Sequence, residues 1–69
     1  MIKVDSIKNT DSNYNSFKVS LFADNKAEVI PGAAIEGLPS NATIEMGSSV
    51  ITANGELAFM KSDGTWNWI

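Results

Sequence analysis

The sequence predicts a small all-β domain, and three features of the chain support this fold class. Two turn signals, an Asn-Gly pair at 54–55 and a Ser-Asp-Gly run at 62–64, separate three apolar runs. The segment 16–23 alternates apolar and polar side chains with the two-residue period of a half-buried strand. No stretch has the apolar period of an amphipathic helix of useful length. We therefore interpret residues 1–69 as a single small β domain that ends in a three-stranded antiparallel meander.

The first half of the chain contains two predicted strands. Residues 2–7 place Ile2 and Val4 on one side of an extended segment. The polar run 8–16, rich in Asn, Asp and Ser, favours a turn, and Tyr14 is its one apolar anchor. In the following strand, alternation separates one face with Phe17, Val19 and Leu21 from another with Lys18, Ser20 and Phe22.

The middle of the chain is read as an ordered connection. A turn is expected at Asp24 and Asn25, and Pro31-Gly32 ends any strand ladder. Residues 33–36 could form one short 3₁₀ turn before the chain becomes extended again near residue 43. Gly47 then permits a bend or a bulge.

The last third of the chain predicts strands at 48–53, 56–61 and 65–69. Asn54-Gly55 favours a two-residue type I′ turn, because both residues accept a positive φ. The Ser-Asp-Gly run favours a three-residue loop with a glycine, Gly64, in the left-handed conformation.

These loops imply a register in which Ile51 lies opposite Ala58. One face of the meander then carries Ile51, Ala58, Met60, Trp66 and Trp68, and the other carries Val50, Leu57, Phe59 and Ile69. Both faces are apolar, whereas the first half of the chain, with Phe17, Val19 and Leu21, can cover only one. We therefore expect the remaining face to be an interface.

Composition excludes several function classes. The chain has no Cys and no His, so disulfides, thiolate metal sites and histidine general bases are ruled out, and we expect neither a metal nor a cofactor. Five lysines, no arginine and eight acidic residues give a net charge of −3, which argues against nucleic-acid binding. No catalytic constellation is found, and we expect a protein that is not an enzyme. The start of the chain lacks the apolar core of a signal peptide, and no membrane span is expected.

Both tryptophans lie in the last four residues, where Trp66 and Trp68 point to the same side of a strand. Three roles are open for them: packing in a core or subunit contact, anchoring into another protein, and stacking on a sugar. The candidate interface residues are Trp66, Trp68, Ile69, Met60, Ile51, Ile35 and Leu38.

The ending "GSSVITANGELAFMKSDGTWNWI" resembles the C-terminal end of small structural-module proteins of tailed phages and prophages of Gram-positive bacteria. The shared pattern is a Gly-Ser, a strand, a "T-x-x-G-E-x-A/Y" hairpin and a final "S-x-G-T-W" strand. "FADNKAEV" and "IEGLP" are similar to the front of such proteins, so the resemblance covers residues 22–69.

The resemblance implies a virion protein, made in the bacterial host cytoplasm and called head decoration or head fibre-like. It implies a homo-oligomer, with a trimer favoured, on the major capsid protein. No long fibre-forming segment is present, which favours a compact decoration or cement subunit. A tail or baseplate component, a carbohydrate- or host-surface-binding module using Trp66 and Trp68, and a regulator of a host protein are the alternatives.

Overall fold

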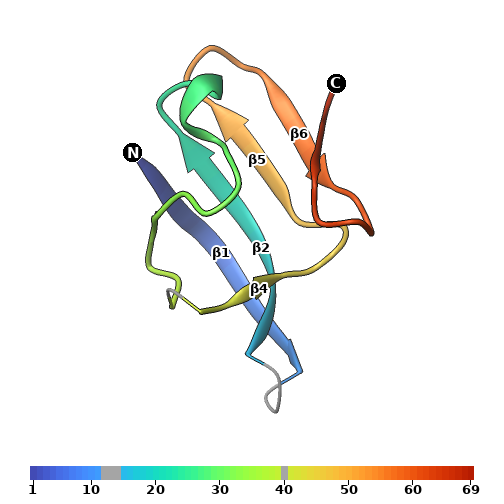
Figure 1. The fold of residues 1–69 in the computed structure, drawn as a ribbon. Coiled ribbons are helices and arrows are strands. Elements are labelled where there is room, and N and C mark those ends of the chain that lie inside the picture. The colour runs from blue at the N-terminus through green and yellow to red at the C-terminus, as the bar shows by residue number, and fades with distance from the viewer. Residues whose placement is uncertain (12–14, 40) are drawn as a thin grey trace.

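The computed structural model describes residues 1–11, 15–39 and 41–69 and shows a small all-β protein built on one mixed sheet (Figure 1). This confirms the predicted fold class and the C-terminal antiparallel meander. The sheet has seven strands in the order β3-β1-β2-β5-β6-β7, with β4 beside the first residues of β2. The elements are β1 (Ile2–Asp11), β2 (Ser16–Ala23), the 3₁₀ helix η1 (Lys26–Glu28), β3 (Ile35–Glu36), β4 (Thr43–Ile44), β5 (Ser49–Thr52), β6 (Leu57–Met60) and β7 (Trp66–Trp68).

Strands β1 and β2 form a long antiparallel hairpin. The alternating segment Ser16–Ala23 is a strand with the predicted bounds. The other strand begins at Ile2 as predicted but runs to Asp11, so the expectation of a turn from residue 8 is wrong. Pairing with β2 continues past Ile7 and satisfies the backbone, and this outweighs the turn preference of the polar residues. The predicted anchor Tyr14 lies outside the described residues.

The connection from β2 to β5 crosses one face of the sheet, where it runs in front of β1 and β2 in Figure 1. The expected 3₁₀ turn at 33–36 is wrong, because the 3₁₀ helix comes earlier, at Lys26–Glu28. Asn25 caps that helix, its Oδ1 accepting a hydrogen bond from the Glu28 N–H at 3.1 Å. Ile35–Glu36 instead pairs with the start of β1 as a parallel edge strand, which places Ile35 against the core.

The bend predicted at Gly47 separates β4 from β5, and both strands pair with β2 in parallel. Gly47 has φ +91°, a conformation that glycine adopts without strain. At the break, the fully buried Ser48 accepts a hydrogen bond on its Oγ from the Val19 N–H at 3.0 Å. The Ser48 hydroxyl therefore accepts the hydrogen bond that a backbone carbonyl would accept from Val19 in an uninterrupted strand pairing.

The loop between β6 and β7 matches its prediction. The Lys61 N–H donates to the Thr65 carbonyl at 2.8 Å and the Gly64 N–H to the Lys61 carbonyl at 3.1 Å, and Gly64 has φ +85°. As a result Met60 lies opposite Trp66 and Ala58 opposite Trp68, as predicted.

The loop between β5 and β6 differs from its prediction. The Thr52 N–H donates to the Glu56 carbonyl and the Gly55 N–H to the Thr52 carbonyl, both at 2.9 Å, so the loop holds three residues rather than two. Among the described residues only Asn15 and glycines have positive φ, so Asn54 cannot be in a type I′ turn.

One extra loop residue shifts the register and exchanges the faces of β5. Val50 lies opposite Ala58, and Ile51 lies opposite Leu57. Because side chains alternate, Val50 turns to the covered face and Ile51 to the opposite face, the reverse of the prediction. The cause is the parallel pairing with β2, which sets Val50 beside Leu21, where both are buried.

The core lies between the sheet and the crossing connection. The expectation that the first half of the chain covers the meander is wrong for β1 and β2, which extend the sheet instead. The cover consists of apolar residues of the crossing connection, namely Val29, Ala33 and Leu38. The buried apolar residues are Ile2, Val19, Leu21, Ala23, Val29, Val50, Ala58 and Met60, and Val4, Phe17, Ala33, Ile35, Leu38, Ile44, Trp66 and Trp68 pack around them. We call this side of the sheet the covered face and the opposite side the outer face.

Candidate functional site

The register divides the predicted interface residues between the two faces of the sheet. Five of them belong to the covered face, and the other two, Ile51 and Ile69, belong to the outer face. The covered-face residues are Trp66, Trp68, Met60, Ile35 and Leu38. The sequence alone placed Ile51 with the tryptophans, and the one-residue shift in register separates them.

The two tryptophans form a wall of this chain's own core. Both are half-buried and pack against buried residues of the sheet. The Nζ of Lys26 lies 5.0 Å from the centre of the Trp68 ring, a cation–π contact that ties η1 to the edge strand β7. Between the sheet and the crossing connection lies a cavity of about 510 Å³, lined by both tryptophans.

The outer face carries an apolar patch, which we define as Phe22, Ile51, Leu57, Phe59 and Ile69. Register places Phe22, Ile51 and Leu57 side by side across β2, β5 and β6. The Ile69 N–H donates to the Leu57 carbonyl at 2.9 Å, which continues the row onto the end of the chain described here. Exposed fractions of 48% for Ile51, 42% for Phe59 and 81% for Ile69 show that the described parts of the chain leave much of the patch open to solvent.

The patch could be foreseen only in part. The alternation of β2 predicted that the side chain of Phe22 points to the other face of the sheet from that of Leu21. The predicted meander placed Leu57, Phe59 and Ile69 together on one face. The missing information was the parallel pairing of β2 with β5, which joins Phe22 to the meander.

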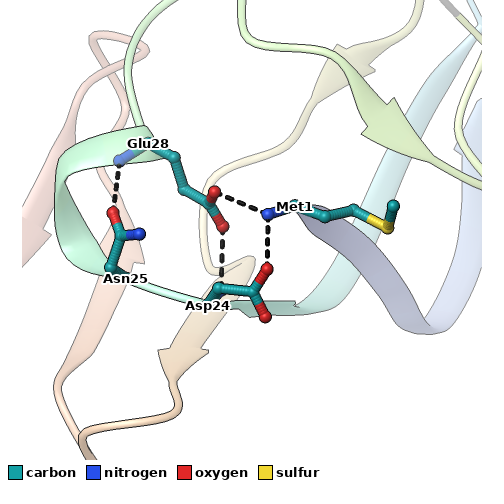
Figure 2. A network of polar contacts seen from close by, with 4 residues as sticks. All are labelled: Met1, Asp24, Asn25 and Glu28. Atoms are coloured by element: carbon teal, nitrogen blue, oxygen red, sulfur yellow. Dashed lines mark hydrogen bonds and ion pairs between the residues drawn. The ribbon is translucent and has the colours of Figure 1, made fainter.

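A polar network joins the beginning of β1 to the start of the crossing connection (Figure 2). The Met1 amino group lies 2.7 Å from Asp24 Oδ2 and 2.6 Å from Glu28 Oε2, and the Asp24 N–H donates to Glu28 Oε1 at 2.8 Å. Hydrogen bonds to the two carboxylates raise the pKa of the Met1 amino group, and the hydrogen bond to Asp24 has the larger effect. The hydrogen bond from the same amine lowers the pKa of Glu28.

Two further sets of polar side chains form hydrogen bonds within single loops. Asp63 Oδ1 accepts hydrogen bonds from the Thr65 hydroxyl at 2.6 Å and from its N–H at 3.1 Å, and these lower the pKa of Asp63. The Thr52 hydroxyl donates a hydrogen bond to Glu56 Oε1 at 3.2 Å and accepts one from the Glu56 N–H at 3.1 Å across the β5–β6 loop. Within the described ranges no three His, Cys, Asp or Glu side chains gather as metal ligands would.

Comparison with known protein families, curated proteins and solved structures finds no match to this chain. In the part of the chain that the structure describes, no helix is long and apolar enough to span a lipid bilayer.

Proposed function

We propose that this chain is a non-enzymatic structural subunit of a tailed-phage particle, a capsid decoration or cement protein that binds the outer shell. What supports the proposal is the apolar patch on the outer face, together with the resemblance of residues 22–69 to phage structural-module proteins. Large apolar side chains gathered on one face of a small protein are typical of a surface that another protein covers.

Size adds a physical argument for such a contact. A 69-residue chain without cysteine buries only a small hydrophobic core and has no disulfide to stabilise it. Small domains of this kind are commonly stabilised by association. A symmetric shell offers many equivalent positions, and an oligomer that contacts several of them gains avidity from weak individual contacts. The proposal includes a homo-oligomer, with a trimer favoured, which sedimentation equilibrium of the purified protein tests.

The main test is quantitative mass spectrometry of purified phage particles, with copies of this chain normalised to the major capsid protein. Hundreds of copies per particle are expected of a shell decoration subunit. A handful of copies would move the protein to the neck, tail or baseplate, which is the alternative location. Complete absence from particles would overturn the proposal.

A matched pair of variants tests whether the patch makes the contact. Ile51→Glu places a charge at the centre of the patch, and Ile30→Glu places the same charge at another exposed isoleucine, 59% exposed on the crossing connection. We expect Ile51→Glu to reduce the copies per particle at least about tenfold, because a carboxylate in an apolar contact is left unpaired. Ile30→Glu should keep the wild-type copy number, and equal losses would count against the patch.

The cavity beside the tryptophans favours a second candidate, a small carbohydrate- or host-surface-binding module. Its volume of about 510 Å³ is within the range of ligand sites, and Trp66 and Trp68 are the aromatic side chains such a site would use. Quenching of tryptophan fluorescence by host wall polysaccharide would support this function. An unchanged spectrum at saturating polysaccharide would exclude it.

A further inference from the structure

The backbone of β7 has one side that bonds β6 and one side that does not. The Ile69 N–H donates to the Leu57 carbonyl, so Ile69 is at a hydrogen-bonded position of the antiparallel pair. Such positions alternate along a strand, and the N–H and C=O groups of Trp66 and Trp68 therefore point away from β6. Because β7 is last in the sheet order, no described strand lies on that side. We call these backbone groups of Trp66 and Trp68 the open edge.

The hydrogen bonds of β6 agree with this alternation. Met60 lies opposite Trp66, and its N–H donates to the Ser48 carbonyl at 2.8 Å while its carbonyl accepts from the Gly47 N–H at 3.1 Å. Met60 therefore bonds the chain on the β5 side and leaves Trp66 without a backbone partner in β6. Elsewhere in the described parts of the chain, no turn or loop backbone group bonds the open edge.

The sequence of β7 does little to protect this edge. Native edge strands are commonly blunted by charged side chains, by proline or by a bulge. The opposite edge of the sheet, β3, carries Glu36 and is soon followed by Pro39. Strand β7 reads Trp-Asn-Trp and has neither a charge nor a proline, so only its length of three residues limits it. Backbone donors and acceptors at strand spacing are the groups with which a further strand pairs.

The open edge adjoins the cavity beside the tryptophans. The side chains of Trp66 and Trp68 line that cavity of about 510 Å³, and Ile30 and Ala33 line it from the crossing connection. Ile30 is 59% exposed, so the cavity reaches the surface of the protein. A strand that pairs with the open edge directs every second side chain to the covered face, next to the indole rings. One extended segment therefore reaches both the backbone groups and the cavity.

The cavity lining specifies the side chains of such a segment. Among the described residues no charged side chain lines the cavity. The hydroxyl of Thr65, one of two lining threonines, already donates to Asp63 Oδ1 at 2.6 Å. Apolar side chains therefore match the lining best. Because Trp66 and Trp68 are separated by one residue, the apolar side chains opposite them are separated by one residue as well.

We infer that β7 accepts an extended segment of a partner protein as an additional antiparallel strand, with two apolar side chains, one residue apart, entering the cavity. Antiparallel pairing lets the residues opposite Trp66 and Trp68 bond every group of the open edge, and it is the more stable ladder. Main-chain hydrogen bonds supply affinity in this mode of binding, and the pocket for alternate side chains supplies specificity. The surface is separate from the apolar patch, so the inference goes beyond the decoration role and does not depend on it.

Two other occupants use only part of this site. A second copy that pairs its own β7 with the open edge brings its own tryptophans to the covered face. Those side chains pack against their own core, so they are not free to enter the neighbour's cavity. A sugar can fill the cavity beside the tryptophans, but it has no strand-spaced groups to pair with the open edge. An extended segment uses both parts.

The test titrates a capped pentapeptide, Thr-Val-Thr-Val-Thr, into isotope-labelled protein and follows the amide signals by NMR. N-methylation of one valine removes an N–H that points to β7, whereas N-methylation of the central threonine removes one that points to solvent. In the protein, Ala33→Leu fills part of the cavity. Its control is Ala34→Leu, the same change at the next residue, which is exposed and does not line the cavity. Thermal unfolding checks that Ala33→Leu keeps the wild-type stability, as cavity-filling changes commonly do.

For the wild-type protein we expect shift changes at the amides of Trp66 and Trp68 and at Ala33. The valine-methylated peptide, and the parent peptide with Ala33→Leu, should bind at least about tenfold more weakly. The threonine-methylated peptide and Ala34→Leu should bind as the parent pair does. No shift at millimolar peptide, shifts confined to the apolar patch, or unchanged binding of the valine-methylated peptide or of Ala33→Leu would overturn the inference.

Two further measurements identify the other occupants. Dimers in sedimentation equilibrium that protect the Trp66 and Trp68 amides from hydrogen exchange without peptide would overturn the inference in favour of a second copy. Quenching of tryptophan fluorescence by host wall polysaccharide, with no response to the peptide, would overturn it in favour of a sugar site.

Copy number in purified particles separates this inference from the proposed function. Particles with the full copy number of a protein that does not bind the peptide would refute strand addition and leave the decoration role standing. Particles without the protein would refute the decoration role, whereas the peptide titration would still decide whether β7 accepts a strand.

Discussion

Truncating Val50 and Ile51 in turn tests the register of β5 directly, because the two neighbours point to opposite faces. Val50 is fully buried beside Leu21 and Ala58, and Ile51 is 48% exposed in the apolar patch. In the register that the Asn-Gly turn predicts, these positions would be exchanged. The observed register therefore predicts a larger loss of stability for Val50→Ala, and the register of the Asn-Gly turn predicts a larger loss for Ile51→Ala.

The expected magnitudes follow from burial. Val50→Ala removes two methyl-sized groups from a closed site, which costs about 2–3 kcal/mol once the residual cavity is included. Ile51→Ala removes three such groups, but from a side chain that is half in water and can be re-solvated, so about 1 kcal/mol is expected. For a domain of this size 1 kcal/mol shifts the melting temperature by about 4–8 °C, so the two variants should melt at clearly different temperatures.

Thermal unfolding followed by circular dichroism, with urea titration as a second measurement, gives both values in the isolated protein. An Ile51→Ala variant that is destabilised as much as Val50→Ala, or more, would refute the three-residue loop and the division into covered and outer faces. Protein concentration has to be kept low, because association through the patch would add apparent stability to every variant that retains Ile51.

Three further predictions concern other parts of the chain. Ser48→Ala should cost about 1–3 kcal/mol in urea titration, because the Val19 N–H would be left buried without an acceptor, and an unchanged urea midpoint would contradict this role of the hydroxyl. Gly64→Ala should lower stability by about 1 kcal/mol through its φ of +85° alone, since a Cβ there meets no other atom, and an unchanged melting temperature would exclude the left-handed conformation. Thermal unfolding across pH should show the stability contributed by the Met1–Glu28 network at both ends of the pH range. The Met1 amine stabilises the fold fully below its ordinary pKa of 8.0, and this stabilisation is lost as pH rises through its raised pKa in the folded protein. The Glu28 carboxylate stabilises the fold above its ordinary pKa of 4.5, and this stabilisation is lost as pH falls through its lowered pKa in the folded protein. Glu28→Gln should flatten the acidic limb, and a profile identical to wild type would contradict the network.

Local signals in the sequence predicted those parts of the fold that local interactions determine. The alternation at Ser16–Ala23 predicted a strand with correct bounds, and the glycine at the end of the 62–64 run predicted the β6–β7 loop with its register. In both cases the turn chemistry or the alternation permits one outcome. At Asn54-Gly55 the sequence permits loops of two or three residues, and the choice depends on which β5 side chains β2 can bury.

The candidate site was harder to predict for the same reason. Trp66 and Trp68 were recognised as a pair on one side of a strand, and that is where they lie. Ile51 was grouped with them because the predicted pairing of β5 with β6 is shifted by one residue from the observed pairing. The outer face depends on contacts between strands far apart in the chain, and no local pattern reports that Phe22 and Ile51 share a surface.

The parallel ladder between β2 and β5 also has a consequence for how fast the chain folds. Each of the two antiparallel units, β1–β2 and β5–β6–β7, can form from residues that are near in sequence, on the microsecond scale of hairpins. Joining them requires closure of the whole connection from residue 24 to residue 48, and that entropy is lost before any parallel contact compensates for it. We therefore expect the docking of two preformed hairpin units to limit the folding rate. Val50→Ala would then slow refolding, whereas substitutions within the Trp66–Trp68 strand would mainly speed unfolding.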